Sequence, residues 1–161
     1  MEEQLKVLKI MSEVTSRIDM NAFAQLVNLN LNQTIERMQD LVDAGLIRKL
    51  GSGYSITEKG KTVLKAITSI PKDLAFHFYT EVGKPAGFSA GSLRDFYEIV
   101  KRISVKSVEF HLYRGDFENW IKTAFKDEAL ANELARLKNA KITGEEIRQE
   151  ILKSIVSIYN F

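Results

Sequence analysis

Basic residues gather in one short stretch of this 161-residue chain, where they could bind phosphates. Residues 46–65 hold five lysines or arginines against one glutamate, whereas the whole chain has a formal net charge of +2. Arg48 and Lys49 stand just before the turn sequence Gly51-Ser52-Gly53, whose backbone amides could donate to phosphate oxygens. Cations that neutralise phosphates release counterions, so the stretch favours contact with a nucleic-acid backbone. A merely solvated face is the other interpretation of these charges.

His77 and His111 are the only histidines, and the chain has no cysteine that could act as a nucleophile or metal ligand. Both histidines lie in segments rich in strand-forming residues. We therefore expect them on one sheet face, together with Tyr79, Glu109 and Tyr113. A metal site needs three or four converging ligands, so we expect no metal and no cofactor here. A polar and aromatic sheet face covered by a partner chain is the interpretation that we favour.

Arg114 follows the second histidine within the sequence Tyr113-Arg114-Gly115-Asp116. It either pairs with Asp116 or binds an anion, so His111 and Arg114 form a weak candidate ligand site. The glycine-rich segment 83–91 lacks the lysine-serine ending of a P-loop and the spacing of a dinucleotide fingerprint. Because no Ser-His-Asp order and no nucleophile motif is present, the sequence favours a protein that is not an enzyme.

Hydrophobic periodicity predicts the elements that carry the basic stretch. Helices are expected over residues 2–13, 21–28, 33–44 and 58–70. In the third helix Ile35, Met38 and Leu41 are expected to face inward, Asn32 to cap the start and Gly45 to end it. Short strands are expected on either side of the Gly-Ser-Gly turn. The predicted order in the first 70 residues is therefore three helices, a hairpin and a fourth helix.

The segment "FAQLVNLNLNQTIERMQDLVDAGLIRKLGSGYSITEKGK" resembles the winged helix-turn-helix of prokaryotic transcription regulators, over about residues 5–67. Its most specific part is a helix that closes on "AGLI", followed by strand, turn, strand and "ITEKGK". The resemblance implies that helix 33–44 is a recognition helix for the major groove of double-stranded DNA and that the hairpin is the wing. The residues expected to contact DNA are Asn32, Gln33, Thr34, Arg37, Arg48, Lys49, Ser52, Tyr54, Lys59 and Lys61.

The charge of the expected recognition helix weighs against this interpretation. Glu36, Asp40 and Asp43 outnumber Arg37, and acidic side chains near phosphates are repelled, although a carboxylate can accept from a cytosine amino group. A winged helix that serves as a protein-interaction surface therefore stays open as an alternative.

The second half predicts a small, mostly helical domain. Strands over 74–82 and 105–113 are expected to flank a helix that begins at Ser92, as a β-α-β unit with parallel strands. Three more helices follow, with expected caps at Asp116, Asp127 and Thr143. The stretches "GFSAGSLRDF", "SVEFHLYRGDFENWI" and "DEALANELARL" resemble an uncharacterised domain of archaeal proteins, and this resemblance implies no activity.

The last helix, about 144–159, carries an apolar stripe that is wider than packing against one neighbour requires. Its members include Ile147, Ile151, Ile155 and Ile158. The stripe is either buried on several sides or takes part in a dimer. We expect a homodimer formed through this helix or through the sheet face that carries the histidines.

Together these observations predict an α+β protein with a winged helix-turn-helix domain at 1–70 and an α+β domain of unknown function at 74–161. DNA binding in transcription regulation is the leading function. The alternatives are a protein-interaction adaptor and a small-molecule sensor or enzyme centred on the second domain. No apolar run approaches the roughly 20 residues of a membrane span, and the N-terminus lacks the order of a signal peptide, so we expect a cytoplasmic location without membrane contact.

Overall fold

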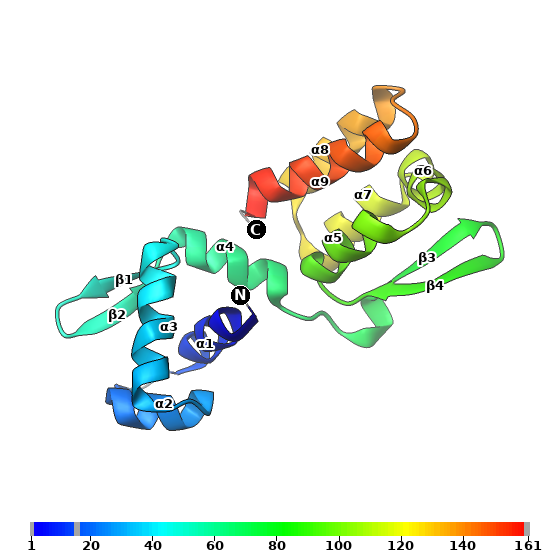
Figure 1. Ribbon diagram of the computed structural model, residues 1–161. Coiled ribbons are helices and arrows are strands. Elements are labelled where there is room, and N and C mark those ends of the chain that lie inside the picture. Colours follow the sequence, from blue (N-terminus) through cyan, green and yellow to red (C-terminus); the bar gives the residue numbers. More distant parts are fainter. Residues whose placement is uncertain (1, 15–16, 160–161) are drawn as a thin grey trace. The chain divides into compact units, whose positions relative to one another are not determined.

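The protein is described by a computed structural model that covers residues 2–14 and 17–159 (Figure 1). The chain divides into two compact units, Met1–Lys65 and Ala66–Phe161, each with its own hydrophobic core. The division falls inside a helix, whereas the sequence predicts a boundary between residues 70 and 74. Each unit combines helices with one antiparallel two-stranded sheet, so the described protein is of mixed α and β structure.

The first unit follows the predicted order of helices and hairpin. Its elements are α1 (Glu2–Glu13), α2 (Met20–Val27), α3 (Leu31–Asp43), β1 (Ile47–Leu50), β2 (Gly53–Ile56) and α4 (Glu58–Ile67), whose last two residues belong to the second unit. The core includes Phe23 and Val27 from α2, Met38 and Leu41 from α3, and Ile47 from β1. These contacts hold the helices and the base of the hairpin together.

Helix α3 buries Met38 and Leu41 as predicted, but it differs from the prediction in its first turns. Thr34 is fully buried, whereas Ile35 is 49% exposed. Thr34 can occupy a core position because its hydroxyl donates to the carbonyl of Asn30 at 2.8 Å. The cap is Asn30 rather than Asn32: its side chain accepts from the backbone of Gln33 at 2.8 Å, and the Gln33 side chain accepts from the backbone of Asn30. This capping box fixes the start of α3, two residues before the predicted cap. Of the predicted inward residues, only Ile35 was wrong.

The hairpin β1–β2 is held at its base by the start of α4. The Thr57 hydroxyl donates to the carbonyl of Gly45 at 2.6 Å and accepts from the backbone N–H of Gly60 at 3.0 Å. A Cβ atom on Gly60 would lie 2.1 Å from the carbonyl oxygen of Leu46, so no other residue fits there without a backbone shift. The sequence "ITEKGK" therefore anchors the hairpin through a close approach of two backbones.

The second unit begins with a hairpin and continues as a helical bundle. Its elements are η1 (Lys72–Leu74), β3 (Phe76–Glu81), β4 (Lys84–Ala90), α5 (Leu93–Arg102), α6 (Val105–Arg114), α7 (Asp116–Phe125), α8 (Glu128–Asn139) and α9 (Glu145–Tyr159). The large core joins the inner face of β3 to the helices through aromatic residues such as Phe78, Phe96 and Phe117. Asp127 caps α8 as expected, whereas Asp116 is the first residue of α7, after an N-cap at Gly115.

The predicted β-α-β unit is wrong. Strand β3 pairs directly with the next segment, Lys84–Ala90, as an antiparallel hairpin, so the supposed glycine loop is itself a strand. Gly83 in the turn and Gly87 in the strand take φ values of +75° and +82°. Glycine and Pro85 mask a strand in this segment because both are depleted from regular strands.

Residues 105–113 form a helix, α6, although their composition is that of a strand. Ser104 caps the helix, and Gly115 ends it at a φ of +80°. The residues that it buries have helical spacing: Ser107, Val108, His111 and Leu112. Packing of this face on the core and the two end signals overrode the strand propensity of the individual residues.

The apolar stripe of α9 is buried inside its own unit. Ile147, Ile151 and Ile155 are fully buried in the second core, and Arg148 donates to the carbonyl of Val100 at 2.5 Å. Helix α9 packs against α5, α6 and α8, which accounts for the width of the stripe. The stripe is therefore buried on several sides, which is one of the two alternatives that the sequence left open.

Candidate functional sites

The hairpin β1–β2 presents two cations to solvent. Arg48 lies opposite Ser55, and its Nε donates to the Ser55 hydroxyl at 3.2 Å, while Lys49 is exposed opposite Tyr54. Neither cation forms an ion pair with a carboxylate in the part of the chain that the structure describes. A Cβ on Gly51 would meet nothing within 4 Å, so the turn is open to a ligand.

The tip of this hairpin is connected to the loop before α2. The guanidinium of Arg17 donates to the Ser52 hydroxyl at 3.3 Å, and both side chains are exposed. The sequence analysis did not single out Arg17. Tyr54 packs partly buried against the first core, so it mainly supports the hairpin. The tip thus adds a third cation to the basic pair on β1.

The other predicted basic contacts are engaged within the first unit. The Lys59 ammonium donates to the carbonyl of Ala44 at 2.8 Å, next to the end of α3. Lys61 forms an exposed ion pair with Glu58 at 2.7 Å. Lys59 therefore helps to end a helix, and the charge of Lys61 is partly neutralised.

On α3, two of the four predicted contact residues are not available. Thr34 has no exposed surface, so the prediction that it contacts DNA is wrong. Arg37 is only 22% exposed and lies among three carboxylates, with shortest distances of 3.7 Å to Glu3, 2.9 Å to Glu36 and 3.2 Å to Asp40. It therefore balances the acidic side of the helix rather than extending toward a phosphate.

The outward face of α3 carries three uncharged residues, Asn32, Ile35 and Gln39, together with the exposed carboxylates Glu36 and Asp43. All three are exposed, and they follow one another by three and four positions, so they share one face of the helix. Gln39 donates from Nε2 to Asp43 at 2.8 Å. Ile35 and Gln39 were missed because Ile35 was taken as a core residue. The pattern Asn30-x-x-Gln33 is the signal in the sequence that gives the correct first residue of α3.

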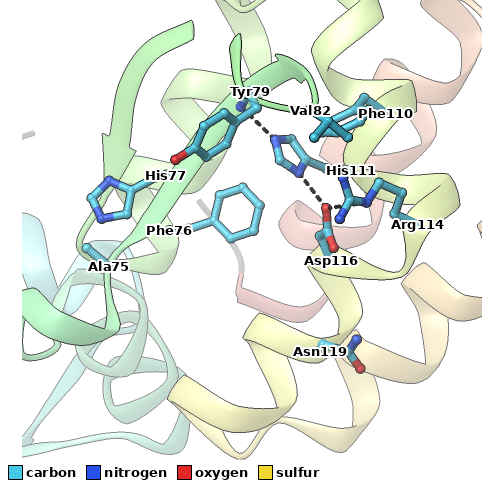
Figure 2. Close-up of a pocket in the computed structure, with 11 residues that line it drawn as sticks. Ala75, Phe76, His77, Tyr79, Val82, Phe110, His111, Arg114, Asp116 and Asn119 are labelled. Carbon is cyan, nitrogen blue, oxygen red and sulfur yellow. Dashed lines mark hydrogen bonds and ion pairs between the residues drawn. The ribbon is translucent and has the colours of Figure 1, made fainter. Parts of the chain in front are cut away.

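The second unit has an open hollow of about 600 Å³ beside β3 and α6 (Figure 2). Its lining includes both sequence-predicted ligand residues, His111 and Arg114. The remaining lining residues are Ala75, Phe76, His77, Tyr79, Val82, Gly83, Phe110, Asp116 and Asn119. His77 lies on β3 and is exposed, whereas His111 lies on α6 and is 3% exposed. The prediction that both histidines share a sheet face is therefore wrong.

Both ring nitrogens of His111 are already hydrogen-bonded (Figure 2). Nε2 accepts from the backbone N–H of Tyr79 at 2.7 Å, which requires that the proton sits on Nδ1. Nδ1 then donates to the carboxylate of Asp116 at 2.8 Å. Burial lowers the pKa of His111, although Asp116 acts in the opposite direction. His111 is thus a neutral structural residue without a free nitrogen for a ligand or a metal.

His111 and Ser107 together hold the edge of β3. They are one turn apart on α6, and both contact the backbone of Tyr79: its N–H donates to His111, and its carbonyl accepts from the Ser107 hydroxyl at 2.6 Å. These two side chains satisfy backbone groups that an edge strand would otherwise leave open. We call Ser107, His111 and the Tyr79 backbone the edge clip.

Arg114 lies at the rim of the hollow. Its guanidinium is 4.7 Å from the ring centroid of Phe110 and 3.5 Å from Asp116, and half of the side chain is exposed. The pairing with Asp116 is the structural role that the sequence analysis weighed against anion binding. Among residues 2–14 and 17–159, no group of three or more His, Asp or Glu side chains is placed to hold a metal ion.

The chain belongs to a family of unknown function, DUF5752, whose model matches residues 21–156. The match begins in α2 and ends in α9, so it includes parts of both units. No curated protein and no solved structure matches the chain. Within the described residues, no helix is both long enough and apolar enough to span a membrane. The function must therefore be argued from the surfaces of the two units.

Proposed function

We propose that the first unit is a winged helix-turn-helix that binds double-stranded DNA, and that the protein regulates transcription. The main support is the pair of exposed cations on β1, Arg48 and Lys49, because each lies free of carboxylates in the described chain and beside an open turn. Phosphates are the partners that such a pair fits best.

The arrangement of α2 and α3 supports the same proposal. Asn28 ends α2 in the left-handed region at a φ of +59°, and Asn30 starts α3 two residues later. Two helices joined by so short a turn, with the second exposed on its outer face, are the arrangement that helix-turn-helix proteins use to present a recognition helix to the major groove. Strand β1 follows α3 and contacts it, so the wing would lie beside that groove (Figure 1).

Salt-dependent binding to a duplex of random sequence tests the proposal. The variant Arg48→Gln/Lys49→Gln is compared with wild type by fluorescence anisotropy over a range of salt concentrations. Each lost phosphate contact lowers the slope of log affinity against log salt by about 0.9, so the double variant should lose about 2. Affinity should fall for every sequence alike, because phosphate contacts carry no sequence information.

The second unit offers a matched control. The variant Lys84→Gln/Lys106→Gln removes the same charge from two lysines that each contact Glu81 at 3.0 Å. If the wing binds phosphates, this control keeps the slope of wild type. Equal losses in the two double variants would show a general charge effect and would reject the wing as the contact.

A protein-interaction surface is the second candidate, and one observation favours it. Leu26 on α2 is 55% exposed, and Leu31 and Ile35 on α3 are 39% and 49% exposed. Exposed large apolar side chains that gather into a patch mark sites where partner proteins bind, so these three residues are the candidates for such a patch. Loss of partner binding in Leu26→Ser/Leu31→Ser, with unchanged DNA affinity, would support an adaptor.

We further propose that the DNA-bound form is a homodimer, since paired recognition helices would meet half-sites one helical turn apart. The buried stripe of α9 does not provide its surface. Light scattering at micromolar concentration, with and without duplex, measures the oligomeric state directly, and a monomer in both conditions would reject the dimer.

A further inference from the structure

We infer that the hollow beside β3 and α6 binds a zwitterionic α-amino acid with a large apolar side chain. Arg114 binds the carboxylate of this ligand, Asp116 binds its ammonium group, and the apolar wall of the hollow contacts its side chain. The inference goes beyond the proposed DNA binding and does not depend on it, because every residue that lines the hollow belongs to the second unit.

Two opposite charges stand side by side at the rim of the hollow, and they do not saturate each other (Figure 2). The shortest distance between the Arg114 guanidinium and the Asp116 carboxylate is 3.5 Å, and within the described residues the guanidinium forms no hydrogen bond. Asp116 accepts from His111 through Oδ2, whereas Oδ1 has no donor in that same part of the chain. Both charged groups therefore keep hydrogen-bonding capacity for a ligand.

A second arginine–carboxylate pair in the same unit shows the closed alternative. On α8, Nε of Arg136 lies 3.1 Å from each carboxylate oxygen of Glu133, and Nη2 donates to the same group. Such a forked contact occupies the donors of the guanidinium and the acceptors of the carboxylate together. Arg114 is held in another way, because its guanidinium lies over the ring of Phe110, 4.7 Å from the centroid. The ring positions this cation without using its N–H donors.

The arrangement of charges indicates the class of ligand. An amino acid carries its carboxylate and its ammonium group on one carbon atom, so the two groups are neighbours, as Arg114 and Asp116 are. A simple anion would be repelled by Asp116, and a simple cation would be repelled by Arg114. Asn119 lies one turn after Asp116 on α7 and is exposed, so its amide can donate to the carboxylate or accept from the ammonium group.

The wall of the hollow fits an apolar side chain. Phe76, Val82 and Phe110 line it, and Val82 in the hairpin turn is 81% exposed. Figure 2 shows Phe76 on the strand side of the hollow and the two charged side chains on the helix side. A ligand side chain placed between them would remove this apolar surface from water, which favours binding. The volume of about 600 Å³ admits a side chain as large as that of leucine or phenylalanine.

A series of ligands that differ by one group tests the inference on the whole chain. Phenylalanine carries both charges, hydrocinnamate lacks the ammonium group, and phenethylamine lacks the carboxylate. Loss of either charge should weaken binding about ten-fold. Free glycine, which has both charges and no side chain, should also bind more weakly than phenylalanine or leucine. Amide NMR chemical shifts followed during each titration give the affinity, and the largest changes should be at Tyr79, Val82 and Arg114.

Two variants assign the two charges of the ligand to side chains. Arg114→Gln should weaken the binding of phenylalanine and hydrocinnamate but not that of phenethylamine. Asp116→Asn should weaken the binding of phenylalanine and phenethylamine but not that of hydrocinnamate. The asparagine oxygen can still accept from His111, so the edge clip is kept. Arg136→Gln is the matched control, because it removes the same charge from the closed pair on α8, and it should keep the affinity of wild type for all three ligands.

The apolar contact is tested at the exposed position Val82. The variant Val82→Ser should lower the affinity for phenylalanine about five-fold and leave the affinity for free glycine unchanged. Circular dichroism verifies that each variant is folded.

The outcomes decide the ligand and the site separately. If phenethylamine or hydrocinnamate binds as tightly as phenylalanine, the ligand is not a zwitterion and the inference is overturned. Equal losses in Arg114→Gln and Arg136→Gln would reject the hollow as the site. Folded wild type that binds neither phenylalanine nor leucine would reject both. The duplex measurements concern the first unit, so none of these results changes the test of the proposed function.

Discussion

The hairpins β1–β2 and β3–β4 are both antiparallel pairs with a glycine at the turn, yet they are attached to their units in different ways. The first is anchored at its base by Thr57 and Gly60, and its tip is open. The second is held along its edge, where the edge clip binds the backbone of Tyr79. A hairpin fixed only at its base can present its side chains to a partner, whereas one fixed along its edge becomes part of the fold.

The cations of the two hairpins also differ: within the described chain, those of the first are unpaired, and those beside the second are paired with a carboxylate. Arg48 and Lys49 have no carboxylate partner in the described residues. On the second hairpin, Glu81 is contacted by Lys84 from β4 and by Lys106 from α6, and their hydrogen bonds lower the pKa of that carboxyl group. Cations that are paired internally have less to offer a phosphate, so the comparison favours the first hairpin as the phosphate contact of the proposed function.

Gly60→Ala should cause the largest loss, because it breaks the anchor of the first hairpin. The added Cβ would lie 2.1 Å from the carbonyl oxygen of Leu46, which is backbone and cannot rotate away. We expect the first unit to lose about 3 kcal/mol of unfolding free energy. Hydrogen exchange of amides in the first unit measures the loss without interference from the second.

Gly51→Ala is the matched control at the free end of the same hairpin. Its Cβ would meet nothing within 4 Å, so only the positive φ of +62° opposes the substitution. The expected loss is about 1 kcal/mol. Equal losses at the two glycines would contradict an anchor at the base.

His111→Ala should have the next largest effect, because it opens the edge clip of the second hairpin. The substitution removes a ring that contacts Phe76 and Phe117, and it leaves the buried N–H of Tyr79 without its acceptor. We expect the second unit to lose about 2–3 kcal/mol. Trp120 is the only tryptophan, and its ring centroid lies 5.3 Å from that of Phe76, so its fluorescence during urea unfolding follows this unit.

His77→Ala provides the contrast within the same hollow. His77 is exposed, and its Nδ1 lies 2.7 Å from the Ser89 hydroxyl. A change at such a surface position is expected to alter stability by no more than about 0.5 kcal/mol. A loss at His77 as large as that at His111 would show that the clip is not what holds the hairpin.

These two hairpins also show what sequence alone could and could not predict. The first was predicted because periodic helices, Gly45 and the Gly-Ser-Gly turn all indicate the same arrangement. The second was missed because Val82-Gly83 is a weak turn signal, and because Pro85 and Gly87 disguise a strand. Nothing local to β3 shows that its edge would be covered by side chains from a helix 28 and 32 residues later.

In the candidate sites too, features set by neighbouring residues could be predicted, and features set by distant residues could not. The exposed cations Arg48 and Lys49 could be predicted because a hairpin places neighbouring residues at its surface. The ion pairing of Arg37 could not be predicted in full. One of its partners is Glu3 from α1, which is brought near only by the packing of α1 against α3. The burial of His111 could be inferred only from its helical spacing with Ser107, a pattern that strand-forming neighbours obscured.

The smallest expected effect is a pH dependence that belongs to the second hairpin alone. A proton on Nε2 of His111 would face the N–H of Tyr79, so the folded protein resists protonation, and burial lowers the pKa of this imidazole. The unfolded chain binds that proton below about pH 6.5. The unfolding free energy of the second unit should therefore be constant above this pH and should fall as the pH drops below it.

Side-chain nitrogen NMR gives a direct reading of the same property. His111 should keep the signature of a neutral imidazole protonated at Nδ1 while the pH falls through the range where an exposed imidazole titrates, near about pH 6.5. Protonation of His111 above the unfolded value would mean that Asp116 outweighs burial, and stability would then rise on acidification, which would contradict a clip that depends on a neutral ring.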